Sequence, residues 1–447
     1  MNQQIASSSN ADLLIYSRWI ATVDDNNTLL ENSAVAIKDG KIIAVMNAVE
    51  AKALFPDSQA IHLNDHLLIP GLINAHGHTG MTLLRGYADD LPLQTWLGEH
   101  IWPAEHAFVS PDFVKTSSQL ALAEMLKSGT TCFADMYFFP EATLQAVEET
   151  GIRAHLVPPV FDFPSNWQQK PGDYLSAIVG LITNHKPNTL VSFGFGPHAP
   201  YTVSDDTFLA VLDANKALNL GLHIHLHETA QEITDSLAQF GKRPVKRLYD
   251  LGALTDKTQC VHMTQIDDED ISLLQETGAS VIHCPRSNMK LASGGCPVDR
   301  LLEAGINVGL GTDSAASNNA LNMISEMTQA AMLAKIVSAK ADAVSAVQAL
   351  RMATINSAKA LGLASKIGSI EIGKDADLCA VDLSDLHHQP VYSPLSALIY
   401  GETQHKVSDV WVAGQQLLES GKLTQINEQS LRTDVNQWRD KISKSSR

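Results

Sequence analysis

The sequence predicts an α/β protein: a (β/α)8 barrel of the TIM type, flanked by a small β-sandwich domain made from both chain ends. Between residues 69 and 313, eight short apolar or β-branched runs alternate with longer stretches of helical periodicity, and about 250 residues is a typical length for such a barrel. Polar residues also gather where these runs end. A doubly wound sheet shares the alternation, so periodicity alone leaves it as an alternative.

The flanking domain is predicted from residues 11–68 and 368–416. Both segments alternate apolar and polar residues as strands do, and the first contains the hairpin signal KDGK. Because neither segment alone would bury a comfortable core, we expect them to fold together. The predicted boundaries are residues 1–68 and 367–447 for the flanking domain and 69–366 for the barrel, with a connecting helix near 342–362 and a polar helix after 420.

The eight predicted barrel strands lie in short runs separated by helical stretches such as FVKTSSQLALAEMLKSG, DTFLAVLDANKALNLG and EDISLLQETG. Each of these stretches closes with a glycine, which suits the end of a helix. The runs are LIPGLINAHGH, TTCFADMYF, IRAHLVPPVF, LVSFGFGPHAP, GLHIHLHE, QCVHMT, ASVIHCP and INVGLGTD.

Composition limits the partners. The 447 residues carry a formal net charge of -17, which argues against nucleic acids and anionic membranes. We found no apolar stretch of about 18 residues that would indicate a membrane span. The first residues lack the basic start and apolar core of a signal peptide, and the five scattered cysteines form no C-x-x-C pair. We therefore expect a cytoplasmic protein with reduced thiols.

His76 and His78 stand one residue apart in GLINAHGH, at the end of an apolar run. Residues spaced by two on a strand point the same way, so both imidazoles could reach one metal ion. Two hydrogen-bonded histidines lining a pocket would give the same pattern. Further ligands elsewhere in the chain are needed to decide.

The run HIHLHE supplies the next candidates. We favour His225 as a ligand because Glu228 then follows three residues later, past the strand end, where it can face a bound water. For His223 and His227 we expect core roles. HETAQ begins like the H-E-x-x-H helix of zinc proteases but ends in Gln231, so that interpretation fails.

Asp313 follows the last apolar run, in GLGTDS. It could cap the next helix, but beside three histidines a carboxylate can also ligate the ion and take a proton from its water. His262 could orient that water. All of these residues lie at or near the carboxyl ends of predicted strands, which form the catalytic face of a (β/α)8 barrel. The pattern predicts metal-assisted hydrolysis.

Competing catalytic motifs are missing from the sequence. There is no G-x-S-x-G elbow, no G-x-x-x-x-G-K-[ST] loop and no H-x-E with P-C-x-x-C pair. GFGPHA matches the dinucleotide fingerprint G-x-G-x-x-A, but Pro197 and His198 occupy the start of the expected phosphate-binding helix, so we reject a dinucleotide site.

Several segments together resemble the amidohydrolase superfamily, and within it the 5'-methylthioadenosine/S-adenosylhomocysteine deaminases. The resemblance runs from about residue 11 to about residue 420. The segments are PGLINAHGHTGMTLLRGYADDLPLQTWL, GFGPHAPYTVS, HLHET, NMKLASGG and GTDSAASNN.

This resemblance implies one divalent ion per subunit, Zn²⁺, with a set of four ligands. Glu228 would be the proton shuttle and His262 would hold the attacking water. Asp313 would take a proton as hydroxide attacks C6 of a purine nucleoside, with ammonia and an inosine analogue as products. The implied ligands are His76, His78, His225 and Asp313.

The resemblance also implies substrate contacts. Glu105 matches the residue that holds the two ribose hydroxyls and His198 one that contacts the purine nucleoside, whereas Trp96 could pack on the thioether. Arg153 matches an arginine found in the family. No arginine occurs from residue 154 to 242, where relatives that accept a carboxylate can place a second one, which favours 5'-methylthioadenosine over S-adenosylhomocysteine.

Other interpretations stay open at this point. Glu105 could be a solvated loop carboxylate and Trp96 a core residue. The chain could act on another heterocycle, as guanine or cytosine deaminases and s-triazine chlorohydrolases of the superfamily do. It could be a peptidase, or a scaffold that has lost its metal. Because barrels of this size often associate, we also expect a homo-oligomer.

Overall fold

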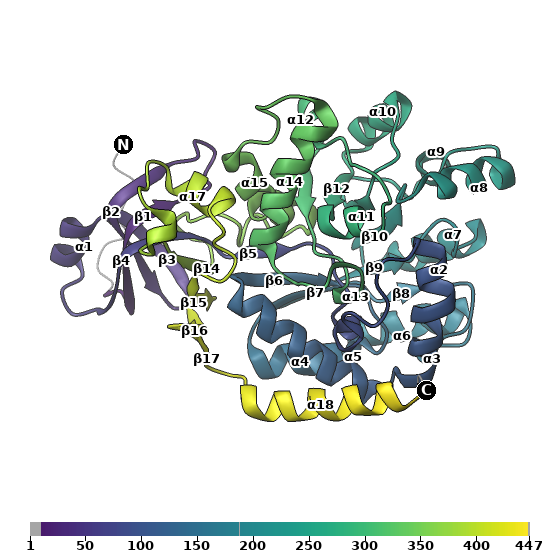
Figure 1. The fold of residues 1–447 in the computed structure, drawn as a ribbon, viewed down its shortest axis with the longest axis horizontal. Coiled ribbons are helices and arrows are strands. Elements are labelled where there is room, and N and C mark those ends of the chain that lie inside the picture. The colour runs from purple at the N-terminus through teal and green to yellow at the C-terminus, as the bar shows by residue number, and fades with distance from the viewer. Residues whose placement is uncertain (1–9, 187, 446–447) are drawn as a thin grey trace.

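Eight parallel strands close around one axis in the larger of two units of the computed structural model, which describes residues 10–186 and 188–445 (Figure 1). Neighbouring strands follow one another in sequence, as in a barrel and unlike a doubly wound sheet. The strands are β5 (Leu72–Asn74), β6 (Thr130–Asp135), β7 (Arg153–Leu156), β9 (Val191–Pro197), β10 (Gly221–Leu226), β11 (Thr258–His262), β12 (Ser280–His283) and β13 (Val308–Leu310). Each overlaps one of the eight predicted runs, so the barrel is confirmed.

The first and last strands meet and close the barrel. The amide of Ala75 donates to the carbonyl of Leu310 at 2.9 Å, and Gly77 forms a parallel bridge with Asp313. The short strand β8 (Pro159–Val160), which follows β7 in the sequence, also pairs with β9. The closure brings the residues that follow β5 against those that follow β13.

Helices cover the outside of the barrel, and the three helical stretches named from the sequence appear as α4, α7 and α10. The predicted connecting helix is divided into two short ones, α15 and α16. The covering helices are α4 (Pro111–Lys127), α5 (Pro140–Thr150), α6 (Pro171–Asn184), α7 (Asp205–Asn215), α8 (Ala230–Phe240), α9 (Pro244–Asp250), α10 (Asp268–Thr277), α12 (Val298–Glu303), α14 (Met323–Ser338), α15 (Ala346–Met352) and α16 (Ile355–Ala360).

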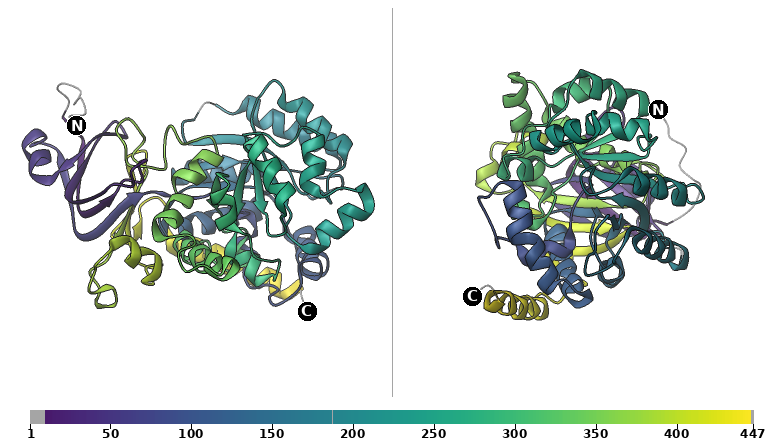
Figure 2. Two further views of the ribbon diagram at one scale, coloured as in Figure 1. Left: turned by 90° about the horizontal axis from the view of Figure 1, so that it is seen from above. Right: turned by 90° about the vertical axis from the view of Figure 1, so that its right-hand side faces the viewer.

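Both chain ends build the smaller unit, which stands beside the barrel (Figure 2). Hydrogen bonding joins its eight strands into one mixed sheet, ordered β17-β16-β15-β14-β4-β1-β2-β3. The two chain ends meet where β4 pairs antiparallel with β14. The strands are β1 (Leu13–Ala21), β2 (Leu29–Lys38), β3 (Lys41–Asn47), β4 (Gln59–Pro70), β14 (Leu378–Asp382), β15 (Val407–Val412), β16 (Gln415–Glu419) and β17 (Lys422–Leu423).

Both faces of this sheet are covered near β1. Ile15 packs in a cluster with Trp411, whereas the adjacent Leu14 packs in a second cluster with Phe55 next to α1 (Ala48–Leu54). Successive strand residues point to opposite faces, so the two clusters lie on opposite sides. The predicted hairpin turn is present, with positive φ at Asp39 (49°) and Gly40 (76°) between β2 and β3.

The predicted polar tail is the helix α18 (Glu428–Ser445), and it returns to the barrel. It runs along α4 (Figure 1), where the Trp438 ring meets Phe113 edge on at 5.1 Å. The tail therefore covers a barrel helix, and it joins an apolar cluster that includes the predicted substrate residue Trp96.

Among the helices in the described ranges, none is both long enough and apolar enough to cross a bilayer. All five cysteines are free and buried, as expected for reduced thiols.

Candidate active site

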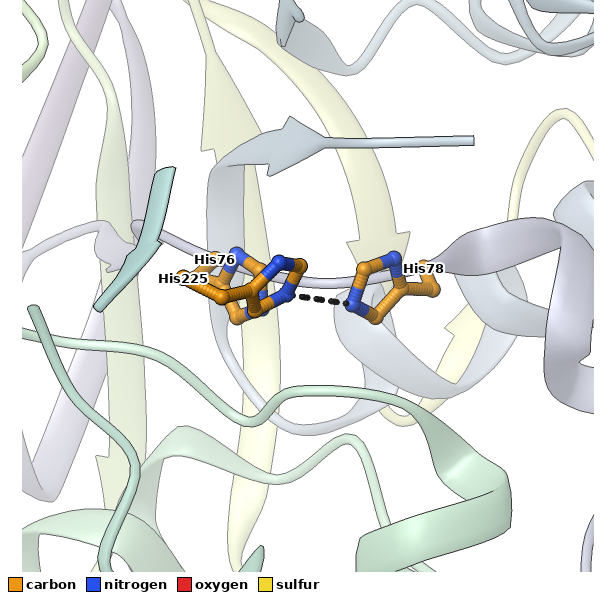
Figure 3. Close-up of side chains that lie close together, drawn as sticks. All are labelled: His76, His78 and His225. Carbon is orange, nitrogen blue, oxygen red and sulfur yellow. Dashed lines mark hydrogen bonds between the residues drawn. The ribbon is translucent and has the colours of Figure 1, made fainter. Parts of the chain in front are cut away.

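The imidazoles of His76, His78 and His225 converge at the carboxyl ends of the barrel strands (Figure 3). Their nearest ring nitrogens all lie within 4.8 Å of one another. The carboxylate of Asp313 completes the group, with Oδ1 3.2 Å from His78 Nε2 and 3.5 Å from His76 Nε2. The closure of β13 on β5 brings His76, His78 and Asp313 together, and β10 contributes His225 as the fourth predicted metal ligand.

Neighbouring carbonyl groups fix the protonation of two of the histidines. His78 Nδ1 lies 2.6 Å from the carbonyl oxygen of Met136, and His225 Nδ1 lies 2.8 Å from that of His198. A carbonyl oxygen only accepts, so each Nδ1 carries the proton and donates it. Each Nε2 then carries a lone pair, and the two lone pairs face each other at 3.3 Å (Figure 3), an arrangement that a cation bound by both nitrogens would satisfy.

His76 is fully buried, and its Nε2 makes no hydrogen bond. Its Nδ1 lies 2.8 Å from Nε2 of His223, so a residue for which we expected a core role orients a predicted ligand. A buried ring nitrogen without a partner is costly. Three Nε2 atoms and one carboxylate form a donor set that suits Zn²⁺, and a cation at this point would satisfy the nitrogen.

The charges of the group also suit a divalent cation. Burial would raise the pKa of Asp313, but the imidazoles of His76 and His78 beside the carboxylate hold it well below its usual range. Ser287 and Ser317 donate their hydroxyls to Asp313 Oδ2 at 2.6 and 3.0 Å. Burial lowers the pKa of His76 to about 4, so this ring is neutral at physiological pH. The site thus offers an ionised carboxylate and a neutral imidazole.

Glu228 and His262 stand beside this group. Asn288 Oδ1 lies 2.9 Å from His262 Nδ1, which turns His262 Nε2 toward Glu228 Oε2 at 3.8 Å. Glu228 follows β10 directly and is 5% exposed. Burial raises the pKa of Glu228, and the Asp313 charge adds to this rise against the opposing effect of His262. A carboxyl group with a raised pKa suits proton transfer.

A cavity of about 1050 Å³, its mouth included, opens above these residues. Its floor is polar and its walls are largely apolar. Among the described residues, none of those that line it is a lysine or an arginine. The walls include Leu93, Trp96, Leu97, Ile101, Trp102, Phe161, Phe163 and Leu291.

Glu105 lies in the cavity wall on α3 (Trp102–Phe108). The hydroxyl of Tyr137 donates to its Oε1 at 2.7 Å. Burial raises the pKa of Glu105 to about 7, against the lowering effect of the Tyr137 bond. The amide of Asn166 donates to the backbone carbonyls of Glu105 and Val109 at 3.1 and 3.0 Å, so the loop before α6 ties down the end of α3.

Trp96 begins a π-helical turn, Trp96–Ile101, between α2 (Leu93–Thr95) and α3. Such turns often occur at functional sites. The indole Nε1 donates to the carbonyl of Ala88 at 3.1 Å while the ring lines the cavity. Trp96 is also 5% exposed and belongs to an apolar cluster, so it is both a core residue and part of the cavity wall.

His198 lines the cavity beside the histidine cluster, with its ring centre 4.7 Å from that of His225. Its Nδ1 lies 2.9 Å from the Thr202 hydroxyl, and its ring packs on Phe161 with the ring centres 4.5 Å apart. Burial and the neighbouring histidines lower the pKa of His198 to about 3, so the ring is neutral.

The structure does not bring Arg153 to this site, which corrects the expectation drawn from the resemblance. Arg153 begins β7, at the opposite end of the barrel from the cavity, and is 1% exposed. Its Nε donates to Asp377 at 2.9 Å and its terminal nitrogen to Asp375 at 3.0 Å. These buried contacts join the barrel to the smaller unit, so the guanidinium has no access to a substrate.

Some residues of the site escaped the sequence analysis. Tyr137 and Phe161 lie at or near the ends of predicted strand runs and Asn288 lies in NMKLASGG, so their positions gave a signal. Phe163, which also lines the cavity, has only its apolar character. Glu232, whose carboxylate contacts the backbone of Glu228, looked like an ordinary helix residue.

This chain is similar to known hydrolases in both sequence and structure. The amidohydrolase family model matches residues 67–417. A 5-methylthioadenosine/S-adenosylhomocysteine deaminase of Teredinibacter turnerae is 47% identical over 98% of this chain and 99% of its own. An adenosine deaminase from Xanthomonas campestris, solved with bound zinc, has a TM-score of 0.96 and is 44% identical, covering 97% of this chain and 99% of its own. A triazine hydrolase variant has a TM-score of 0.90 at 25% identity, covering 96% and 99%.

Proposed function

The chain belongs to the amidohydrolase family, and on this premise we propose that it is a zinc-dependent deaminase that hydrolyses 5'-methylthioadenosine to the inosine analogue and ammonia. One observation carries the proposal: three histidines and Asp313 converge on one point, directly beside Glu228, on the floor of a cavity whose wall holds the carboxylate of Glu105. The deaminase names of the relatives at 47% and 44% identity support it.

In the proposed reaction the cation makes the attacking water more acidic, and the side chains orient that water and transfer the protons. A zinc ion held by these ligands lowers the pKa of water at the site to about 7, so that hydroxide is available at neutral pH. Asp313 receives the proton of the attacking water, and His262 orients that water through its Nε2. Glu228, whose pKa is raised by burial, donates a proton to N1 of the purine, which makes C6 electrophilic. Asp313 then passes its proton to the amino group, which leaves as ammonia when the C6–N bond breaks, and Glu228 takes back the hydroxyl proton as the C6 carbonyl forms.

The cavity walls supply the substrate contacts. The Glu105 carboxylate accepts the two ribose hydroxyls, a role that suits an acceptor without donors. His198 contacts the purine nucleoside. Trp96 and the apolar side chains near it pack against the methylthio group.

The lining favours 5'-methylthioadenosine over S-adenosylhomocysteine. The larger substrate ends in an ionised amino acid, and burying a carboxylate without a cationic partner is costly. No lysine or arginine is found among the described residues of the lining, and Arg153 is held by Asp375 and Asp377. We therefore expect weaker turnover of the charged nucleoside.

A second candidate keeps the chemistry and changes the ring: another amino- or chloro-heterocycle, such as guanine, cytosine or an s-triazine. The structural similarity to a triazine hydrolase at 25% identity favours this candidate. Glu105 argues against it, because a bare heterocycle has no diol to hold.

The proposal also includes a cytoplasmic location and a homo-oligomer, and gel filtration of the purified protein tests the oligomeric state.

Ammonia release tests the proposal directly. Zinc-loaded protein is offered 5'-methylthioadenosine, S-adenosylhomocysteine, adenosine and guanine in parallel. The Glu228→Gln variant is the inactive control, and Glu141→Gln, at an exposed position of α5, is the matched control. Rapid deamination of 5'-methylthioadenosine that only Glu228→Gln abolishes supports the proposal. Activity on guanine alone would contradict the substrate assignment.

A further inference from the structure

The carboxylate of Glu232 lies against the backbone that carries Glu228. Its Oε1 accepts the amide N–H of His227 at 2.9 Å, and its Oε2 accepts that of Glu228 at 2.8 Å. Glu232 is 7% exposed and stands in the first turn of α8, which Thr229 caps. One buried side chain therefore holds two consecutive peptide groups beside the site.

The backbone carbonyls of His227 and Glu228 also accept hydrogen bonds. The amide N–H of Thr264 donates to the carbonyl of His227 at 2.9 Å, and its hydroxyl donates to that of Glu228 at 2.7 Å. The backbone of His227 has a positive φ of 53°. A residue other than glycine adopts this conformation only when its surroundings hold it. Glu232 thus accepts from the N–H groups of this backbone, and Thr264 donates to its carbonyl groups.

The reach of Glu232 is longer than helix capping needs. A glutamate at the third helical position ordinarily bonds back to the N–H of the capping residue, which here is Thr229. Glu232 extends further, to the two residues before the cap. These bonds fix the position of Glu228 in addition to the start of the helix.

We propose that Glu232 is a positioning residue for proton transfer: it fixes the Glu228 backbone so that the Glu228 carboxyl stays beside His262 and the histidine cluster. The role of Glu228 in this inference rests on the proposed function. The hydrogen bonds to Glu232 are observed independently of it.

The test variant is Glu232→Gln, which keeps the size of the side chain. Its single amide oxygen can replace only one of the two acceptors, so one buried backbone N–H loses its partner. We expect kcat for 5'-methylthioadenosine to fall about ten- to a hundredfold, part of what proton transfer contributes. KM, zinc content and Tm should stay close to wild type. Glu232→Asp, one methylene shorter, should be intermediate and carries the test if Glu232→Gln does not fold.

The matched control is Ser236→Ala in the same helix. The Ser236 hydroxyl is buried and donates to the carbonyl of Lys242 at 2.8 Å, away from Glu228. Its loss weakens α8 without touching the two amides that Glu232 holds. We expect this control to lower Tm slightly and to leave kcat unchanged.

Two further readouts separate positioning from mere support of the fold. Glu228 protonates N1 of a 6-chloropurine nucleoside as well, so misplacing Glu228 should lower kcat for the amino and the chloro substrate to a similar extent and leave KM for both unchanged. Hydrogen exchange at the amides of His227 and Glu228, which requires no substrate, should quicken about tenfold in Glu232→Gln. A loss that appears in KM rather than in kcat, or unchanged exchange at these amides, would overturn the inference. If wild type deaminates no nucleoside, the proposed function fails, and faster exchange at unchanged Tm still supports the contact.

Discussion

Removing the negative charge of Glu105 should remove recognition of the ribose diol. A hydrogen bond to a charged acceptor contributes about 1.5 to 3 kcal/mol, so two hydroxyls give about 3 to 6 kcal/mol. Each 1.4 kcal/mol is about tenfold in kcat/KM. Because Tyr137 already donates to Oε1 at 2.7 Å, one oxygen is shared, and we expect the lower end, about a hundredfold, for Glu105→Gln.

The assay compares kcat/KM for 5'-methylthioadenosine and for its 2',3'-dideoxy analogue. Wild type should prefer the diol about a hundredfold, whereas Glu105→Gln should turn over the two nucleosides at similar rates. Glu99→Gln, an exposed position in the π-helical turn before α3, is the matched control. Equal losses on both nucleosides in Glu105→Gln would refute the assigned contact and leave Glu105 a structural role.

Four further predictions follow from the same contacts. Since burial raises the pKa of Glu105 to about 7, its ionised form is lost as pH falls through this value, and KM for ribonucleosides, but not dideoxynucleosides, should rise below about pH 7. Tyr137→Phe removes a donor that lowers this pKa, so the same rise in KM should begin at higher pH. Arg153→Met leaves Asp375 and Asp377 without their cation and should destabilise the fold by about 3 to 5 kcal/mol in calorimetry, with no change in the preference between the two thioether nucleosides. Dialysis against a chelator should abolish ammonia release and lower Tm, and zinc should restore both.

The barrel and the meeting of its candidate metal ligands could be predicted because both depend on local patterns. Strand runs alternate with helical stretches, and the polar residues that end those runs must meet at one face. His76, His78, His225 and Asp313 were identified in this way, and the structure brings them together.

Contacts between distant segments could not be predicted in the same way. The pairing of Tyr137 with Glu105 depends on how α3 lies over the barrel mouth, which no local period encodes. Arg153 was matched by its place in a motif, yet it begins its strand and therefore faces the other end of the barrel. The hydrogen bonds of Glu232 to backbone amides could not be predicted, because every residue except proline has such an amide and the sequence does not show which amides a side chain will reach.

Titration of metal-free protein with zinc tests the central claim most directly. The rate of ammonia release from 5'-methylthioadenosine is measured against the zinc bound per chain. The account predicts a linear rise that stops at one zinc per chain, and no rise in a His225→Ala variant. Full activity without metal, or a rise that continues to a second equivalent, would contradict a single site built from His76, His78, His225 and Asp313.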